Sequence, residues 1–123
     1  MKTLLLVSLV SLFIPRSLEA KEFLDRTKPL TTNELQLVVK AIYRAEGGEK
    51  TKHPYGIIVG SRRFSTVEAK RWCENTVRNN YRRWQGSSET EDFITFLGNR
   101  YCPPSVDRVG NKNWIVNVNK LIK

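Results

Sequence analysis

Three Ser/Thr-x-x-Glu motifs divide the chain into helical segments. They are Thr31-Thr32-Asn33-Glu34, Ser65-Thr66-Val67-Glu68 and Ser88-Glu89-Thr90-Glu91. In such a capping box the hydroxyl accepts a hydrogen bond from the third helical amide, while the glutamate reaches back to the amide of the capping residue. Each motif therefore marks the start of a helix, and a chain punctuated in this way is constrained to fold as a set of short helices.

Apolar residues follow the first two motifs at helical spacing. Over 32–46 the stripe consists of Leu35, Val38, Val39 and Ile42, and Gly47-Gly48 ends the helix because glycine adopts the left-handed conformation at a helix C-terminus. The second helix runs to Gly86-Ser87-Ser88. Its predicted inward face comprises Ala69, Trp72, Cys73, Thr76, Val77, Asn80, Tyr81 and Trp84.

The remaining segments complete a mainly α fold. A third helix, capped at Ser88, is predicted to bury Phe93, Phe96 and Leu97. A last helix over 112–122 is predicted to bury Trp114, Ile115, Val118, Leu121 and Ile122. The segment 47–64 is rich in glycine and should be a loop with at most a minimal β-hairpin near 55–60.

The N-terminus has the layout of a secretory signal. Lys2 precedes an apolar run over 3–14, and a small residue, Ala20, ends the segment. We expect a signal peptide over 1–20 and one domain over 21–123, which would be secreted or periplasmic. The apolar run is too short to span a bilayer comfortably, so no transmembrane segment is expected.

The charge balance points to an anionic partner. The 123 residues carry 21 Lys and Arg against 12 Asp and Glu, a net charge of +9, which falls to +8 when the signal is removed. Nucleic acid, anionic lipid or a cell-wall polymer would suit such a charge. The basic pairs Arg62-Arg63, Lys70-Arg71 and Arg82-Arg83 are not organised by a helix-turn-helix motif, so nucleic acid is not the expected partner. A monomer is expected.

The two cysteines, Cys73 and Cys102, both lie in the exported part. In an oxidising compartment they would form a disulfide that closes a loop of about 30 residues and contributes roughly 3–4 kcal/mol. Two buried free thiols are the alternative. Two Cys and the lone His53 are too few for a metal site, and no cofactor is expected.

The most informative position is Glu46. It continues the buried stripe of the first helix into its last turn, where the helix dipole disfavours a nearby anion. Partial burial would disfavour ionisation as well, so both effects would raise the pKa as a general acid requires. The alternative is an exposed glutamate paired with Arg44 or Lys50.

The segment after Glu46 resembles the lysozyme-like superfamily, which includes goose-type lysozymes and bacterial lytic transglycosylases. In that family a catalytic glutamate ends a helix, and a Tyr-Gly-Ile motif that lines the sugar cleft follows. Glu46 matches the first feature and Tyr55-Gly56-Ile57 the second, while Phe96-Leu97-Gly98-Asn99-Arg100-Tyr101 is similar to the helix end that precedes a cleft-lining tyrosine. The resemblance covers roughly residues 35–118.

The resemblance implies a secreted glycosidase that cleaves the β-1,4 bond between N-acetylmuramic acid and N-acetylglucosamine in peptidoglycan. Glu46 would be its single acid/base, because no Asp lies between Glu46 and Asp92. The expected substrate contacts are Tyr55, Gly56, Ile57, Ser61 and Tyr101. Packing in the core is an equal alternative for the two tyrosines, and a turn role is an equal alternative for Ser61. A non-catalytic basic module that binds polyanions or cell wall is the main rival reading of the whole chain.

Overall fold

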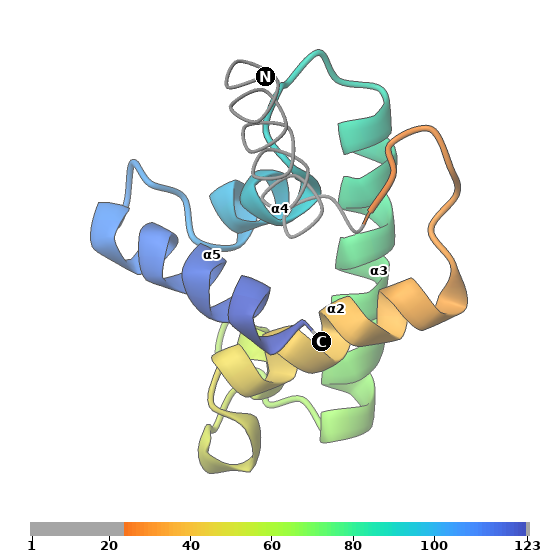
Figure 1. Ribbon diagram of the computed structural model, residues 1–123. Coiled ribbons are helices and arrows are strands. Elements are labelled where there is room, and N and C mark those ends of the chain that lie inside the picture. The colour runs from red at the N-terminus through yellow and green to blue at the C-terminus, as the bar shows by residue number, and fades with distance from the viewer. Residues whose placement is uncertain (1–23, 123) are drawn as a thin grey trace, which may run out of the picture.

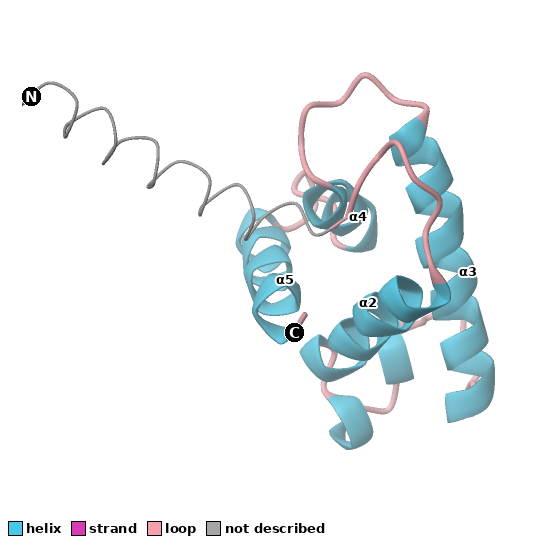
Figure 2. Ribbon diagram, turned by 45° about the vertical axis from the view of Figure 1, so that its right-hand side comes forward, coloured by secondary structure: helices cyan, strands magenta, loops and turns pink. Residues whose placement is uncertain are grey.

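The computed structural model describes residues 24–122 as a set of helices joined by loops (Figures 1 and 2). The predicted signal segment 1–20 lies outside the described residues. Within 24–122 no strand is present, and the hairpin near 55–60 is reduced to one isolated antiparallel bridge between Val59 and Arg62. The predicted mainly α class is confirmed. The elements are α2 (Thr32–Ala45), η1 (Gly48–Lys50), η2 (Pro54–Gly56), α3 (Thr66–Gln85), α4 (Phe93–Tyr101) and α5 (Arg108–Leu121).

Helix α2 has the predicted boundaries. The Thr31 hydroxyl accepts from the Glu34 amide, and the Glu34 carboxylate accepts from the Thr31 amide at 2.9 Å. The stripe from Leu35 to Ile42 is buried. The helix stops at Ala45 because Gly47 takes a positive φ of 106°, which turns the chain out of the helical path. Glu46 is thereby fixed as the residue that caps the helix C-terminus.

Helix α3 also begins at its predicted capping box, formed by Ser65 and Glu68. One residue on its predicted inward face was assigned wrongly. Trp72 is 44% exposed, whereas Ala69 and Cys73 are fully buried. The buried stripe is centred on positions 69, 73 and 77, so residue 72 projects from its edge, where the Trp72 ring packs on Phe64 with centroids 5.4 Å apart.

Helix α4 begins four residues later than predicted, at Phe93 rather than next to Ser88. Asp92 caps it, since its carboxylate accepts from the Thr95 amide at 2.9 Å. The residues before Asp92 are held as a loop instead. The Arg26 guanidinium donates to the carbonyls of that loop, and the Trp84 indole donates to the Glu91 carbonyl at 3.0 Å.

Helix α5 begins at Arg108, four residues before its predicted start at 112, and Asp107 caps it. Asn111 is buried in its first turn, and its amide group donates to the Cys102 carbonyl at 2.8 Å and to the Gly98 carbonyl at 3.2 Å. Helices α4 and α5 approach closely because position 98 is a glycine: a Cβ there would lie 2.5 Å from the Ile115 side chain. These contacts fix the end of α4 against α5.

The four α-helices surround one core. Helix α2 packs against α3 and α5, and α4 packs against the same two helices. The largest fully buried side chains come from all four: Phe93, Ile42, Leu97, Val38, Val39, Val77, Val118 and Cys73. No helix within 24–122 combines the length and the apolar character that crossing a bilayer requires.

The predicted disulfide is absent, and both cysteines are free thiols. Cys73 is fully buried in α3, and the neighbour that reaches its sulfur is Tyr101, whose hydroxyl donates to Sγ at 3.4 Å. Cys102 is the next residue along, and it caps the end of α4 in a half-buried position. Because successive residues project in different directions, the side chain that faces Cys73 is the tyrosine and not the cysteine.

Candidate active site

The Glu46 carboxyl is half-buried at the C-terminal end of α2. Its backbone amide continues the helix and donates to the Ile42 carbonyl at 2.9 Å, so the side chain stays on the inward side of the last turn. Burial raises the pKa of Glu46 above its ordinary value of 4.5. The indole N–H of Trp114 acts in the opposite direction and lowers the pKa by a smaller amount.

The Glu46 carboxyl packs directly against Gly56. A Cβ at position 56 would lie 2.1 Å from Glu46 Oε2 and 2.7 Å from Cδ, so any larger residue would displace the carboxyl. Gly56 also has a φ of +69°, which disfavours other residues on backbone grounds. The preceding Tyr55 shares this conformation with a φ of 61° and is the only non-glycine residue with positive φ within 24–122.

Two aromatic residues, Tyr101 and Trp114, lie near Glu46. The rings of Tyr101 and Trp114 are stacked, with centroids 5.1 Å apart and planes inclined by 23°. The Trp114 Nε1–H is buried and meets no acceptor in hydrogen-bond geometry, although it acts on the pKa of Glu46. Buried donors are almost always paired, so this unpaired N–H close to the carboxyl is available to form a hydrogen bond with it.

Two further titratable groups respond to the same carboxyl. Burial is the main cause that raises the pKa of the Cys73 thiol to about 12, and the charges of Glu74 and Glu46 add to the rise. The pKa of Tyr101 is raised by burial first and by Cys73 and Glu46 next. Both groups therefore stay protonated near neutral pH.

A groove opens next to Glu46 between the 56–59 segment and the helices α3 and α4. Its volume is about 200 Å³. We call it the Trp72 groove, and it is lined by Gly56, Ile57, Ile58, Val59, Trp72, Thr76, Arg100 and Tyr101. Gly56 and Tyr101 belong both to this groove and to the surroundings of Glu46, although Glu46 itself does not line the groove.

The predicted site residues are only partly brought together. Gly56, Ile57 and Tyr101 line the Trp72 groove. Tyr55 is 7% exposed, and its ring packs against Tyr43 at 4.8 Å, so it belongs to the core. Ser61 is exposed in the turn between Val59 and Arg62 and does not line the groove.

Six residues of this region were not predicted as site residues: Ile58, Val59, Trp72, Thr76, Arg100 and Trp114. The helical period of α3 placed Trp72 in the core, and that of α5 placed Trp114 there without indicating which neighbour its N–H would meet. The same period placed Thr76 on the inward face of α3, and Arg100 carries no local signal, because the contribution of each to the groove depends on the approach of α4 to α3.

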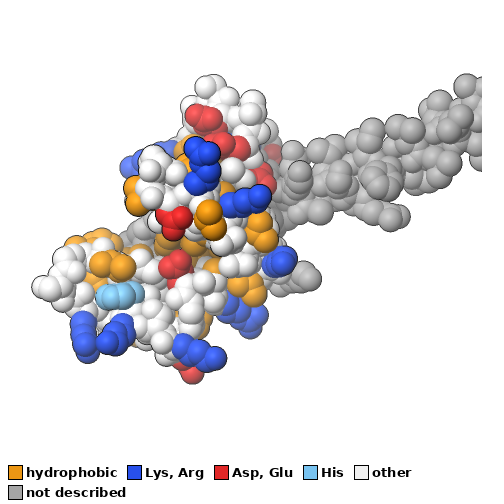
Figure 3. All heavy atoms as spheres, turned by 90° about the vertical axis from the view of Figure 1, so that its left-hand side faces the viewer, with side chains coloured by type: hydrophobic (Ala, Val, Ile, Leu, Met, Phe, Trp, Pro, Cys, Tyr) orange, Lys and Arg blue, Asp and Glu red, His pale blue; other side chains and the backbone are white. Residues whose placement is uncertain are grey.

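Charged side chains cover much of the surface. The space-filling view shows acidic groups in the upper half and at the centre of one face, with lysine and arginine groups among them and along the lower rim (Figure 3). Arg62 pairs with Glu68 at 2.7 Å and lies over the Phe64 ring, and this is the only ion pair within the described residues. The basic pair Arg62-Arg63 is thus partly neutralised.

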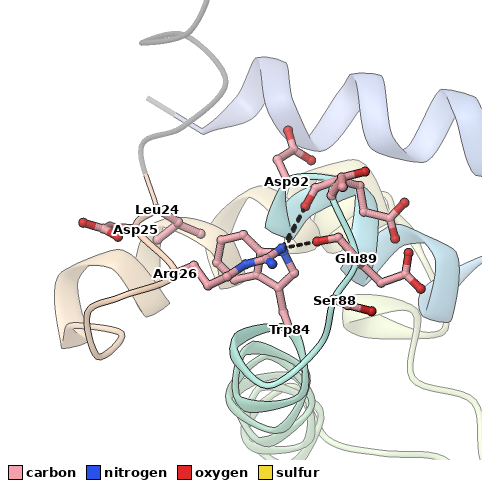
Figure 4. A pocket seen from close by; sticks show the side chains of 9 residues that line it. Leu24, Asp25, Arg26, Trp84, Ser88, Glu89 and Asp92 are labelled. Carbon is pink, nitrogen blue, oxygen red and sulfur yellow. Dashed lines mark hydrogen bonds between the residues drawn. The ribbon is translucent and has the colours of Figure 1, made fainter.

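A larger cavity of about 570 Å³ lies elsewhere, between the 24–26 segment and the loop before α4 (Figure 4). Arg26 lies over the Trp84 ring at 4.6 Å and donates to the Glu89 carbonyl at 2.6 Å. Arg26 and Trp84 donate to carbonyls of the loop before α4, and the Asp92 carboxylate caps α4. These contacts fasten the N-terminal segment to the domain.

No family model, curated protein or solved structure matches the chain. Within the described residues, no group of three or more His, Cys, Asp and Glu side chains is placed to hold a metal ion.

Proposed function

We propose that the protein is a peptidoglycan-cleaving glycosidase that uses Glu46 as its single acid/base on the β-1,4 bond between N-acetylmuramic acid and N-acetylglucosamine. The observation that carries this proposal is the Glu46 carboxyl, which is half-buried, has a raised pKa and contacts Gly56, a residue that lines the Trp72 groove. The resemblance of Glu46 and Tyr55-Gly56-Ile57 to the lysozyme-like superfamily supports the same choice of substrate.

In this mechanism Glu46 first donates one proton and then accepts another. Protonated Glu46 donates its proton to the glycosidic oxygen, and the bond from that oxygen to the anomeric carbon breaks. The Glu46 carboxylate then takes the proton of the muramic acid 6-hydroxyl as that oxygen bonds to the anomeric carbon, which leaves a 1,6-anhydro end. If water replaces the 6-hydroxyl, the product is a reducing end and the enzyme is a hydrolase.

The surroundings of Glu46 suit both halves of this cycle. Burial favours the protonated carboxyl before the first step, as a general acid near neutral pH requires. The unpaired Trp114 N–H favours the carboxylate that forms after it, because a hydrogen bond to a charged acceptor is stronger than one to a neutral acceptor.

The net charge of +9 is consistent with an anionic cell-wall polymer as partner. It would raise the concentration of the chain near such a substrate at low ionic strength. The expected location therefore remains secreted or periplasmic, as a proposal that follows from the substrate.

The test compares Glu46→Gln with Glu49→Gln. Both substitutions remove one carboxylate, but Glu49 is exposed in η1, away from the groove lining. Turbidity of a peptidoglycan suspension should fall with the parent chain and Glu49→Gln, and should stay constant with Glu46→Gln. Mass spectrometry of the fragments then separates 1,6-anhydro from reducing ends.

Equal clearing by the parent and Glu46→Gln would contradict the proposed mechanism. If none of the three chains clears peptidoglycan but all of them sediment with it, the chain is a binding module that carries no hydrolytic or transglycosylase activity.

A further inference from the structure

The Trp72 groove is lined by both an aromatic side chain and a cation. Trp72 is 44% exposed on α3, and the exposed Arg100 lies in the last turn of α4, with the Thr76 side chain also on the groove wall. Packing of the core does not require an indole and a guanidinium to be exposed in the same groove.

Arg100 has no carboxylate partner within the described residues, where the only ion pair joins Arg62 to Glu68. Its guanidinium therefore keeps its donors for a ligand, and an arginine presents them as a planar fork that matches a carboxylate. The opposite wall is apolar, and Ile58 on it is 64% exposed. The groove thus combines a surface for a sugar ring with one positive charge at its edge.

We propose that Trp72 and Arg100 form a subsite that recognises an acidic substituent on the glycan strand, namely a carboxylate carried on the lactyl arm of a muramic acid residue. This inference rests on the proposed function and names which glycans the groove prefers. The indole stacks on the face of the sugar ring, and the Arg100 guanidinium donates to the carboxylate.

A carboxylate on this arm has two sources. In glycan stripped of peptides it is the lactic acid carboxylate itself, and in intact peptidoglycan it belongs to the stem peptide attached there. Chitin oligosaccharides have the same β-1,4 backbone and N-acetyl groups but no carboxylate. The three materials therefore separate recognition of the sugar from recognition of the acid.

The experiment measures binding to soluble peptide-free glycan strands, to soluble muropeptides and to chitotetraose, in the Glu46→Gln background so that no substrate is turned over. The chain with Arg100 intact should bind one or both acidic ligands at least about tenfold more tightly than chitotetraose, as one charge-assisted hydrogen bond provides. Arg100→Gln should remove this preference and leave chitotetraose binding unchanged.

Arg83→Gln is the matched control. Arg83 is also exposed in the last turn of its helix, so both substitutions remove one charge and one favourable interaction with a helix C-terminus. Arg83 does not line the groove. Arg83→Gln should therefore change the affinity for each ligand by less than about twofold, as expected for the loss of a screened surface charge.

Trp72→Ala separates the two parts of the subsite. It should weaken binding of all three ligands to a similar degree, because it removes the stacking face and leaves Arg100 in place. The melting temperature of each variant checks that the fold is retained.

The inference is overturned if Arg100→Gln keeps the preference for acidic glycan, or if Arg83→Gln loses it to the same extent. These outcomes are independent of catalysis. Clearing that depends on Glu46 together with no effect of Arg100→Gln rejects the subsite alone. A preference that depends on Arg100 in a chain without cleavage activity rejects the enzyme and retains the subsite.

Discussion

At the scale of single residues, the contact between Glu46 and Gly56 is the most demanding feature of the site. The carboxyl occupies the volume that a side chain at 56 would need, with only 2.1 Å between Oε2 and a Cβ placed there. The position of the acid is therefore set by what Gly56 lacks. Such a contact cannot be deduced from either residue alone, since ten positions separate them in the chain.

Gly56→Ala should abolish most of the activity and destabilise the fold. The new methyl group displaces the Glu46 carboxyl, and misplacement of a reacting group on the order of 1 Å is enough to cost about a hundredfold in rate. Peptidoglycan clearing and thermal unfolding measure the two effects.

Gly60→Ala provides the control for backbone strain. Gly60 has a φ of +57°, close to that of Gly56, but nothing lies within 4 Å of a Cβ there. It should cost only about 1 kcal/mol of stability and keep the activity. Equal losses of activity in the two variants would show that strain, and not the contact with Glu46, is responsible.

The pKa of Glu46 also predicts how stability depends on pH. A carboxyl whose pKa is higher in the folded chain than in the unfolded chain holds its proton more tightly when folded, so the folded state loses stability as the pH rises above about 4.5. Relative to Glu46→Gln, the parent's free energy of unfolding should fall from pH 4.5 upward and level off above the raised pKa. Urea denaturation at a series of pH values measures this difference. A difference that is constant with pH would contradict the burial of Glu46.

At the scale of elements, the start of α4 shows where local signals stop being sufficient. Ser88 and Asp92 are both good capping residues, and each precedes a stretch that can be helical. The contacts that Arg26 and Trp84 make to the carbonyls of the loop decide between them, and Arg26 is more than 60 residues away in sequence. A pattern within the segment could not reveal this choice.

Asp92→Ala should therefore destabilise the protein by about 1 kcal/mol, the usual cost of losing a helix cap. Ser88→Ala should change stability by less than about 0.5 kcal/mol, because the exposed Ser88 caps no helix. The midpoints of urea unfolding compare the two. The reverse order of effects would place the helix start at Ser88.

At the scale of the whole molecule, the core holds together without a covalent cross-link within the described residues. Both thiols are free, and Cys73 is fully buried with a pKa raised to about 12. A reducing agent should therefore leave the melting temperature unchanged. A maleimide should label Cys102 in the folded protein and Cys73 only after unfolding, as peptide mass spectrometry can record. Protection of both thiols that ends on reduction would reveal a disulfide.

Much of the fold could be predicted from the sequence, because capping boxes and apolar periodicity are local and α2 and α3 obey both. The position of Glu46 on the inward face followed from the same period. Gly56, Ile57 and Tyr101 were named from the family resemblance and line the groove. Trp72, Arg100 and Trp114 could not be predicted as site residues, since they come from three helices and meet only when those helices pack. The cysteine pairing was wrong for the same reason: spacing along the chain does not show that Tyr101 faces Cys73.

The contact between Glu46 and Gly56 also constrains how the sequence can evolve. Two positions that share one volume cannot drift separately, so any lineage that keeps the acid must keep the glycine. A lineage that loses the acid is released from that constraint, and its position 56 becomes free to gain a side chain. Among descendants of this chain, the joint presence of the two residues would mark the active ones, and a substituted position 56 would record the loss of the acid's function before the acid itself was replaced.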